Sequence, residues 1–167
     1  AHKGSLCESG HCVHWSYEYL ASNVGKSRLF VQLAYTTNNP GWISLIWNAS
    51  MANGMVSGDT WMFGVDGDVV RSVDARSKGY EQPIRNAVES LERVTGHVGL
   101  GKVVVNAERL FETADVNDVD VTHGVKYMAS WAYHEGSIDF SQSHAVHTRG
   151  RFTDMIEWLP LQNTPPD

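Results

Sequence analysis

The feature that most constrains the fold is a series of short runs rich in β-branched and aromatic residues, each bounded by turn-forming residues. Asp66-Gly67 has the composition of a two-residue hairpin turn, so the runs on either side of it are predicted to pair antiparallel. Runs at this spacing are typical of an all-β sandwich or barrel. The predicted strands are residues 29–35, 42–47, 60–65, 68–73, 102–105, 125–133 and 152–159.

Residues 82–94 depart from the strand pattern. They carry Ile84, Val88 and Leu91 at helical spacing. The same residues could form a long loop with a single helical turn, and the sequence leaves both interpretations open.

The size and composition of the chain indicate one folded domain. With 167 residues, 42% of them hydrophobic and 19% charged, it can bury a substantial core. Its net charge of −6 comes without a run of like charges, so nucleic acid is not an expected partner. No apolar stretch approaches the ~18 residues that cross a bilayer. We therefore expect a single domain over residues 1–167, with 161–167 as the possible start of a linker.

Cys7 and Cys12 are the only cysteines, and the segment that holds them also contains His11 and His14. A disulfide closing a short loop is predicted, because a zinc site would require four ligands in a defined fold. The alternatives are free thiols, or zinc or copper bound by these four residues. A disulfide forms in an oxidising compartment, and Asn48 begins a glycosylation sequon. Together with the lack of an initiator methionine, these features favour a secreted chain, or one on the extracellular face of a membrane-anchored parent.

Methionine and histidine are the residue types that stand out for chemistry. The sequence contains no hydrolase elbow, phosphate loop, Rossmann fingerprint or paired-histidine zinc helix. Methionine sulfur and imidazole nitrogen together form a common axial pair for haem iron. Met51 and Met55 lie in a polar, glycine-containing loop, and His144 and His147 follow the predicted strand 125–133. The alternative is a methionine packed against the sandwich rim and solvated loop histidines.

A set of short segments between about Trp42 and Phe152 carries a family resemblance. The segments are Gly41-Trp42-Ile43-Ser44-Leu45, Met55-Val56-Ser57-Gly58-Asp59, Gly79-Tyr80-Glu81-Gln82-Pro83, Arg109-Leu110-Phe111-Glu112-Thr113-Ala114-Asp115 with Asp118, Gly124-Val125 and His147-Thr148-Arg149-Gly150. In their order and spacing they resemble the DOMON family, and especially the haem domains of fungal cellobiose dehydrogenases.

The resemblance implies a two-sheet antiparallel β-sandwich that grips one non-covalent haem b at one end, with a loop methionine and a loop histidine on the iron. Met55 matches the methionine by its distance to Asp59, whereas Met51 matches it by its distance from Trp42. We favour Met55 and keep Met51 as the alternative.

On the other side of the iron, His147 matches the histidine through its distance from Gly124 and the Thr148-Arg149-Gly150 that follows it. His144 is the alternative ligand. Further residues that could contact the haem are Tyr80 and Trp61 as lining residues, unless they are plain core aromatics, and Arg149 as a partner for a propionate.

The function implied by the resemblance is electron transfer, and the domain is not expected to be an enzyme by itself. Iron held by methionine and histidine is six-coordinate and has no open position for substrate. The donor would be a flavin or other dehydrogenase domain, or a membrane haem module, with copper oxygenases or quinones among the acceptors. The alternative is a haem-free DOMON sandwich that binds a sugar or serves as an interaction module, which would not need Met55 or His147.

Overall fold

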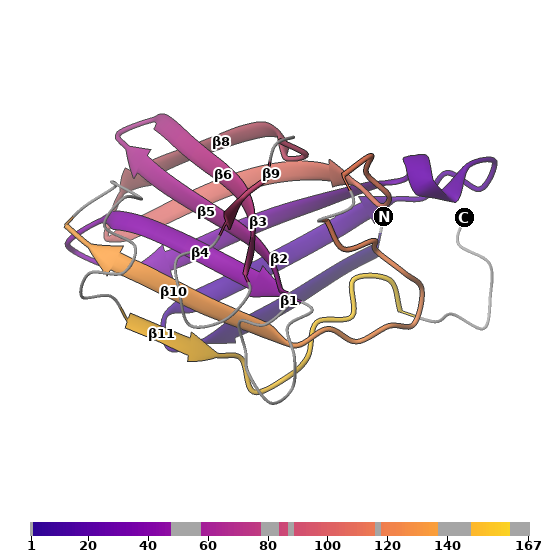
Figure 1. Cartoon of the computed structure of the whole chain (residues 1–167). Helices are drawn as coiled ribbons and strands as arrows, with labels where there is room; N and C mark the ends of the chain where they lie inside the picture. Colours follow the sequence, from indigo (N-terminus) through magenta and orange to yellow (C-terminus); the bar gives the residue numbers. More distant parts are fainter. Residues whose placement is uncertain are drawn as a thin grey trace.

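The computed structural model describes residues 2–47, 58–77, 84–86, 89–115, 118–136 and 148–160. Over these residues the chain forms two antiparallel β-sheets packed face to face (Figure 1). The described part contains no helix long and apolar enough to cross a membrane. The elements are β1 (His2–Glu8), β2 (His11–Glu18), the 3-10 turn η1 (Val24–Lys26), β3 (Arg28–Thr36), β4 (Gly41–Trp47), β5 (Gly58–Asp66), β6 (Val69–Ser77), β7 (Ile84–Arg85), β8 (Glu92–Gly99), β9 (Lys102–Leu110), β10 (Ala129–Glu135) and β11 (Thr148–Arg151).

The first sheet has five strands in the order β1-β2-β3-β9-β8. Along β3 the buried residues alternate with partly exposed ones, which is the period of a strand with one face on the core. Leu29, Val31 and Leu33 face the interior, so Phe30 and Gln32 point to the outside of the sheet.

The second sheet has six strands in the order β11-β10-β4-β5-β6-β7. β5 and β6 form the predicted hairpin, with Asp66 opposite Val69. Gly67 has a φ of +61°, a conformation that favours glycine and that a two-residue hairpin turn requires. The predicted antiparallel pairing is confirmed, but the two-residue turn is Gly67-Asp68 rather than Asp66-Gly67, because Asp66 still pairs with Val69 as the last residue of β5.

The core between the sheets is unusually aromatic. Trp47 makes edge-to-face contacts with Trp61, Tyr127 and Trp158, at centroid distances of 5.0 to 5.7 Å. Such arrangements match the positive edge of one ring to the negative face of another. Val and Leu side chains from β3 and β9 complete the interior, so the two-sheet sandwich is held together by one continuous apolar cluster.

Two predicted strands need correction. Residues 125–133 become a strand only from Ala129, because the preceding segment turns at Gly124, whose φ is +69°. Residues 152–159 form no strand; only Ile156 makes an isolated bridge, to Tyr127. The buried residues of this segment, Phe152, Ile156, Trp158 and Leu159, lack the two-residue period of a strand.

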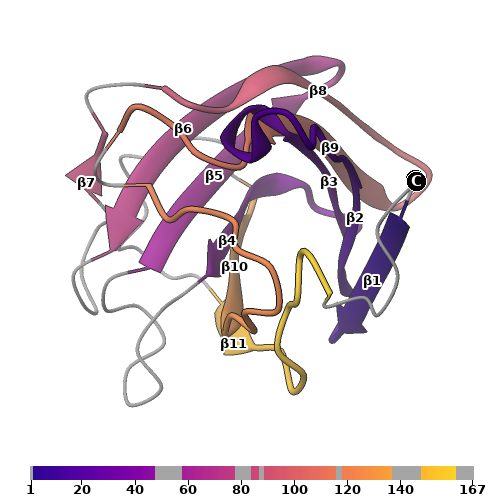
Figure 2. The same cartoon turned by 90° about the vertical axis from the view of Figure 1, so that its right-hand side faces the viewer.

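Segments 118–128 and 152–160 instead lie across the end of the sandwich that faces the viewer in Figure 2. The Thr153 amide and hydroxyl donate hydrogen bonds to the carboxylate of Glu8, at 2.6 and 2.8 Å, which ties this part of the chain to the first hairpin. The prediction of a strand at 152–159 was wrong because the segment is apolar but packs across the end of the sandwich.

The hairpin of β1 and β2 was not predicted. Its two strands contain three histidines, two serines, two glutamates and one glycine, which are not strong strand formers. The turn is Ser9-Gly10, with φ values of +52° and +80°. That dipeptide before the alternating Val13 and Tyr17 is the signal that could have revealed the hairpin.

Residues 82–94 contain no helix where the structure describes them. Ile84 and Arg85 form β7, and the segment from Glu92 belongs to β8. The helical interpretation is therefore wrong for these residues, and Leu91 is buried against the interior cluster.

Candidate functional site

Most of the residues predicted to contact a haem lie outside the described part of the chain, and so does the sequon. These residues are Asn48, Met51, Met55, Tyr80, His144 and His147. Their roles stay predictions, and what the structure adds is the location of the strands that flank them.

The two connections that carry the predicted ligands start from opposite ends of the six-stranded sheet. One connection leaves β4 after Trp47, which pairs with Ala129 at the start of β10. The other leaves the far end of β10, where Glu135 pairs with Gly41 at the start of β4. Seven residues of β4 separate the two ends, roughly 20 Å at the usual rise of a strand. The ligand residues themselves lie outside the described residues, so a haem held at one end of the sandwich stays a prediction.

Between the two ends lies the outer face of β4, β5 and β10. Ile43, Leu45 and Trp47 belong to the interior cluster, so the alternate residues of β4 face outward. By register they lie beside the outward residues of β5 and β10. The outward residues are Trp42, Ser44, Ile46, Thr60, Met62, Gly64 and Ala132, and those with a side chain are at most 8% exposed.

This outer face has the character of a covered apolar surface. Trp42, Met62 and Ala132 pack together as a second cluster, separate from the core, with Val73 beside it. Strands buried on both faces are typical of covered sheets, whereas an ordinary outer face is polar. Gly64 has no side chain, and Trp42, Met62 and Ala132 make this face apolar.

Trp61 and Arg149 are the two predicted haem contacts whose backbone is described. The ring of Trp61 lies in the interior, 5.7 Å from Trp47 and 6.3 Å from Trp158 between centroids, and is 1% exposed. It therefore faces away from the outer face of β5. Arg149 belongs to β11, where its backbone pairs with Ala132 of β10.

His134 is a histidine that the sequence analysis passed over. It lies near the end of β10, with its ring centroid 6.1 Å from that of Trp42. Its Nδ1 atom is buried and has no hydrogen-bond partner among the described residues. The aromatic residues Trp131 and Tyr133, two apart and both packed against the core, are the signal that could have placed it on the outer face.

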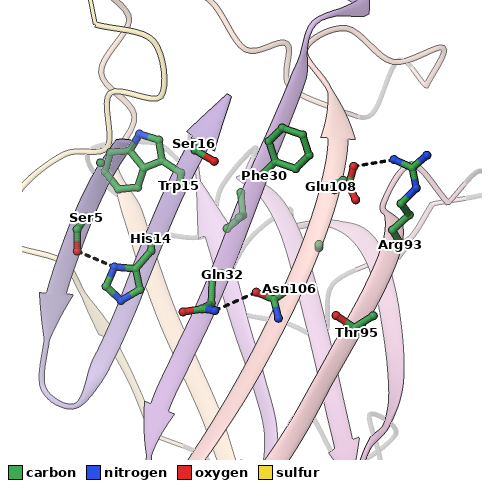
Figure 3. Close-up of a pocket in the computed structure, with 13 residues that line it drawn as sticks. Ser5, His14, Trp15, Ser16, Phe30, Gln32, Arg93, Thr95, Asn106 and Glu108 are labelled. Carbon is green, nitrogen blue, oxygen red and sulfur yellow. Dashed lines mark hydrogen bonds and ion pairs between the residues drawn. The ribbon is translucent and has the colours of Figure 1, made fainter. Parts of the chain in front are cut away.

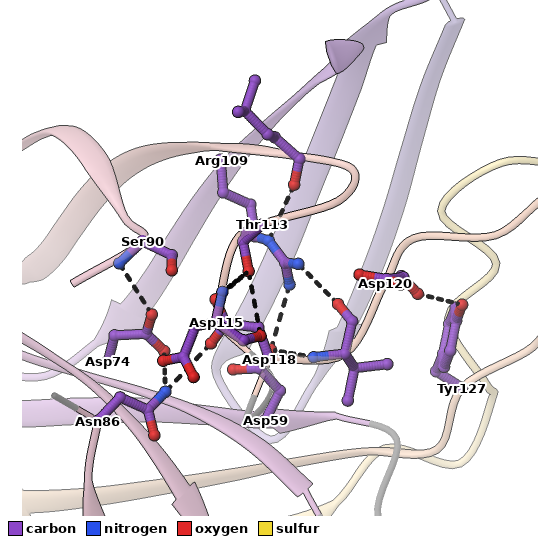
Figure 4. Close-up of polar contacts among 12 residues, drawn as sticks. Asp59, Asp74, Asn86, Ser90, Arg109, Thr113, Asp115, Asp118, Asp120 and Tyr127 are labelled. Atoms are coloured by element: carbon purple, nitrogen blue, oxygen red, sulfur yellow. Dashed lines mark hydrogen bonds and ion pairs between the residues drawn. The ribbon is translucent and has the colours of Figure 1, made fainter. Parts of the chain in front are cut away.

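A buried polar cluster lies at the other side of β5, and Figure 4 shows its side chains converging. Arg109 donates to Asp59 at 3.1 Å and to the Val119 carbonyl at 2.6 Å, while the Val119 amide donates to the same Asp59 oxygen. Asn86 donates to both Asp74, at 3.3 Å, and Asp118, at 3.1 Å. Motif residues Asp59, Arg109 and Asp118 of the family resemblance thus meet in a polar cluster, a role that the sequence did not reveal.

Burial changes the acidity of this cluster. Burial raises the pKa of Asp59, although Arg109 and the Val119 amide act in the opposite direction. Burial also raises the pKa of Asp74, and the negative charges of Asp59 and Asp118 raise it further. In this cluster, therefore, burial outweighs the attraction of Arg109 and favours the protonated form of Asp59 and Asp74.

The N-terminal hairpin contains the predicted disulfide. Cys7 and Cys12 are bonded to each other and are directly opposite in the register of β1 and β2. Their sulfurs are not available as thiolates, so the alternative of a zinc or copper site built on them is not supported. His14 hydrogen-bonds Ser5, and His11 is stacked between Tyr35 and Trp131 in the core.

The outer face of the five-stranded sheet holds an open groove of about 780 Å³, shown in Figure 3. Phe30 and His14 contribute rings, and Gln32 donates to Asn106 at 3.0 Å along its floor. Arg93 and Glu108 form an ion pair of 2.9 Å at one side. The groove is open to solvent and its lining is more apolar than polar, whereas the outer face of the other sheet is covered.

No protein-family model and no curated protein matches the chain, but solved structures do. One is the cytochrome b domain of pyranose dehydrogenase from Coprinopsis cinerea, with a TM-score of 0.57 at 15% identity over 88% of this chain and 77% of that one. Another is the cytochrome domain of Myriococcum thermophilum cellobiose dehydrogenase, with a TM-score of 0.55 at 11% identity over 81% and 69%. The predicted resemblance is thus confirmed at the level of fold, and the chain has the two-sheet β-sandwich fold of these dehydrogenase cytochrome domains.

Proposed function

We propose that this chain is an electron-transfer domain that binds one haem b over the outer face of its six-stranded sheet, with Met55 and His147 as axial ligands. The observation that carries the proposal is the covered apolar face of β4, β5 and β10 between the two connections that hold these residues. The cytochrome domains with the same fold support it.

The chain's own residues have distinct tasks in this proposal. Met62, Gly64 and Ala132 form an apolar floor that excludes water from the iron. Arg149, beside Ala132 in the register, pairs with a propionate. Bound haem supplies a one-electron couple, and two protein ligands leave no position for substrate. The domain therefore relays electrons and is not an enzyme by itself.

The proposed donor is a dehydrogenase domain, because both similar structures are cytochrome domains of dehydrogenases. A flavin domain or a membrane haem module would serve, with a copper oxygenase or a quinone as acceptor. The Cys7–Cys12 bond supports a secreted location, since disulfides persist in oxidising compartments.

Absorption spectra of the purified chain test the proposal. Protein that binds haem should show a Soret band, and its α and β bands should appear on reduction with dithionite. His147→Ala should remove most bound haem, whereas His144→Ala, a matched control in the same connection, should keep it. Haem loss only in His144→Ala would assign the ligand to His144 instead. Folded protein that is colourless and takes up no added haemin would overturn the haem proposal.

The reduction potential of the bound haem tests which methionine is the axial ligand. Met55→His should keep haem but lower the reduction potential by on the order of 100 mV, because imidazole stabilises ferric iron better than thioether does. Met51→His is the matched control and should leave the potential unchanged. The reverse result would place Met51 on the iron.

One observation favours the alternative of a haem-free, sugar-binding sandwich. The groove on the five-stranded sheet combines the Phe30 ring with the hydrogen-bonding side chains of Gln32 and Asn106, a combination suited to a sugar. Colourless protein that binds an oligosaccharide, and loses it in Phe30→Ala, would support that function.

A further inference from the structure

His134 borders the covered apolar face to which we assign the haem. It stands directly opposite Trp42 in the register of β10 and β4, and the centroids of the two rings are 6.1 Å apart. Tyr133, the residue before it, packs against the core, so the side chain of His134 points to the outside of the sheet. Its ring therefore lies at the border of the cluster of Trp42, Met62 and Ala132.

Nδ1 of His134 is a buried polar atom beside this apolar cluster. It has no hydrogen-bond partner among the described residues. Burial of a polar group costs free energy unless a hydrogen bond offsets the loss of water, and most such groups in folded proteins are paired. Nε2 of His11 is also buried without a described partner, but the ring of His11 is enclosed between two aromatic rings of the core. His134 instead lies where the proposed cofactor would contact it.

The covered face itself offers no charged group to an anion. The outward residues that form it do not ionise; they are Trp42, Ser44, Ile46, Thr60, Met62, Gly64 and Ala132. A haem b molecule is apolar over most of its ring but carries two anionic propionates at one edge, which need polar partners when they leave water. Histidine can carry a positive charge near neutral pH, so His134 has the chemistry of a propionate partner.

Arg149, already proposed as a propionate partner, lies close to His134 in the sheet. Its backbone on β11 pairs with Ala132, and Ala132 lies two residues before His134 on β10. Two residues of a strand span roughly 7 Å. Because β10 lies between β4 and β11 (Figure 1), both basic residues stand at the β10–β11 side of the face, whereas Met62 stands on β5.

From this placement we infer that Nδ1 of His134 donates a hydrogen bond to one propionate of the haem, and that His134 and Arg149 together turn the propionate edge toward β10 and β11. The inference rests on the proposed function, to which it adds the orientation of the cofactor. A hydrogen bond from an imidazole to a carboxylate is charge-assisted, and such bonds are roughly twice as strong as neutral ones.

A comparison of haemin with its dimethyl ester tests this inference. Esterification removes the charge of both propionates and leaves the ring and the iron unchanged. His134→Phe keeps a flat ring beside Trp42 but has no nitrogen, so it should bind haemin ~10- to 100-fold more weakly than the unaltered chain does. Its affinity for the dimethyl ester should fall far less, because a neutral ester is a weaker acceptor. Absorbance titrations measure both affinities.

Two further variants serve as controls. His134→Asn places an amide nitrogen near the position of Nδ1 and should recover part of the preference for haemin. His97→Phe makes the same change at an exposed position of β8, in the opposite sheet, and should bind both porphyrins as the unaltered chain does. Circular dichroism checks folding, and His134→Leu replaces His134→Phe if the latter does not fold.

Two results would overturn the inference. One is a folded His134→Phe that prefers haemin over the ester as strongly as the unaltered chain does. The other is an equal loss of affinity for both porphyrins, which is the result that packing against Trp42 alone produces. Failure of the proposed function is distinct, because the unaltered chain then binds neither porphyrin, and the inference falls with it.

Discussion

The imidazole of His11 lies 4.2 Å from the rings of both Tyr35 and Trp131, between centroids, in two nearly parallel stacks. Its Nε2 atom is buried and has no hydrogen-bond partner among the described residues. Burial lowers the pKa of His11 to about 4 from an ordinary value of 6.5. Its position beside two cysteines suggested metal chemistry, yet the residue packs as a neutral aromatic ring.

The shifted pKa of His11 predicts a pH dependence of stability. As the pH falls from 6.5 to 4, the unfolded chain takes up this proton while the folded chain does not, so the free energy of unfolding decreases. At about 1.4 kcal/mol per pH unit, the loss reaches roughly 3 kcal/mol and levels off below pH 4. Urea denaturation across this range should therefore show a smaller loss in His11→Phe.

The control is His97→Phe, which makes the same change at an exposed position of β8 and should follow the unaltered chain. Parallel curves for the unaltered chain and His11→Phe would mean that the buried imidazole does not resist protonation. Other titrating groups act in all three proteins and cancel in the comparison.

At the scale of single residues, the sequence predicts a contact where few partners are available. Cys7 could be assigned to Cys12 because no other cysteine competes. Asp59, Arg109 and Asp118 appeared in the family-like segments, but their contacts join parts of the chain up to 60 residues apart, and no local pattern encodes such contacts.

At the scale of elements, the hairpin of β1 and β2 is held by one covalent bond, the Cys7–Cys12 disulfide. Among the described strands β1 lies at the edge and pairs with β2 alone, and the disulfide joins the two strands beside their turn. The bond closes a short loop, and it stabilises mainly by restricting the unfolded chain.

Removal of this bond should therefore have a modest, local effect. For a loop this short, the chain-entropy estimate is ~2 kcal/mol in the free energy of unfolding for the Cys7→Ser, Cys12→Ser double variant. Urea denaturation measures the loss, and hydrogen exchange should show faster exchange in β1 than in the central strand β3. The reduced unaltered chain is the control and should behave alike. Equal loss of protection in β1 and β3 would contradict a local role.

The strand predictions are correct where the local sequence signal is strong and agrees with the tertiary packing. β3, β4, β5 and β6 have β-branched and aromatic residues between clear turns, and their predictions are confirmed. The segment 152–159 has the same apolar composition but packs across the end of the sandwich, because its buried residues follow tertiary contacts rather than a strand period.

At the scale of the whole molecule, the antiparallel register of β4 and β10 decides where a haem held by residues of both connections could lie. The connections after Trp47 and after Gly136 begin at opposite ends of the sheet, a fact that strand prediction alone cannot give because it depends on which strands pair. The sequence thus predicted the fold and named candidate ligands, whereas the haem at one end of the sandwich stays a prediction and the outer face is our proposal.

Crowding that face should expel the cofactor. Ala132→Phe adds a ring beside Trp42 and Met62, and overpacking of ~1–3 kcal/mol corresponds to roughly 10- to 100-fold weaker haemin binding. Asn106→Phe adds the same ring to the exposed outer face of the opposite sheet and should bind haemin as before. Haemin titration measures both, with circular dichroism to confirm folding and Ala132→Val as a milder variant. If folded Ala132→Phe binds haemin normally while Trp61→Phe does not, the haem enters the interior beside Trp61 instead, because only the interior side of β5 carries that ring.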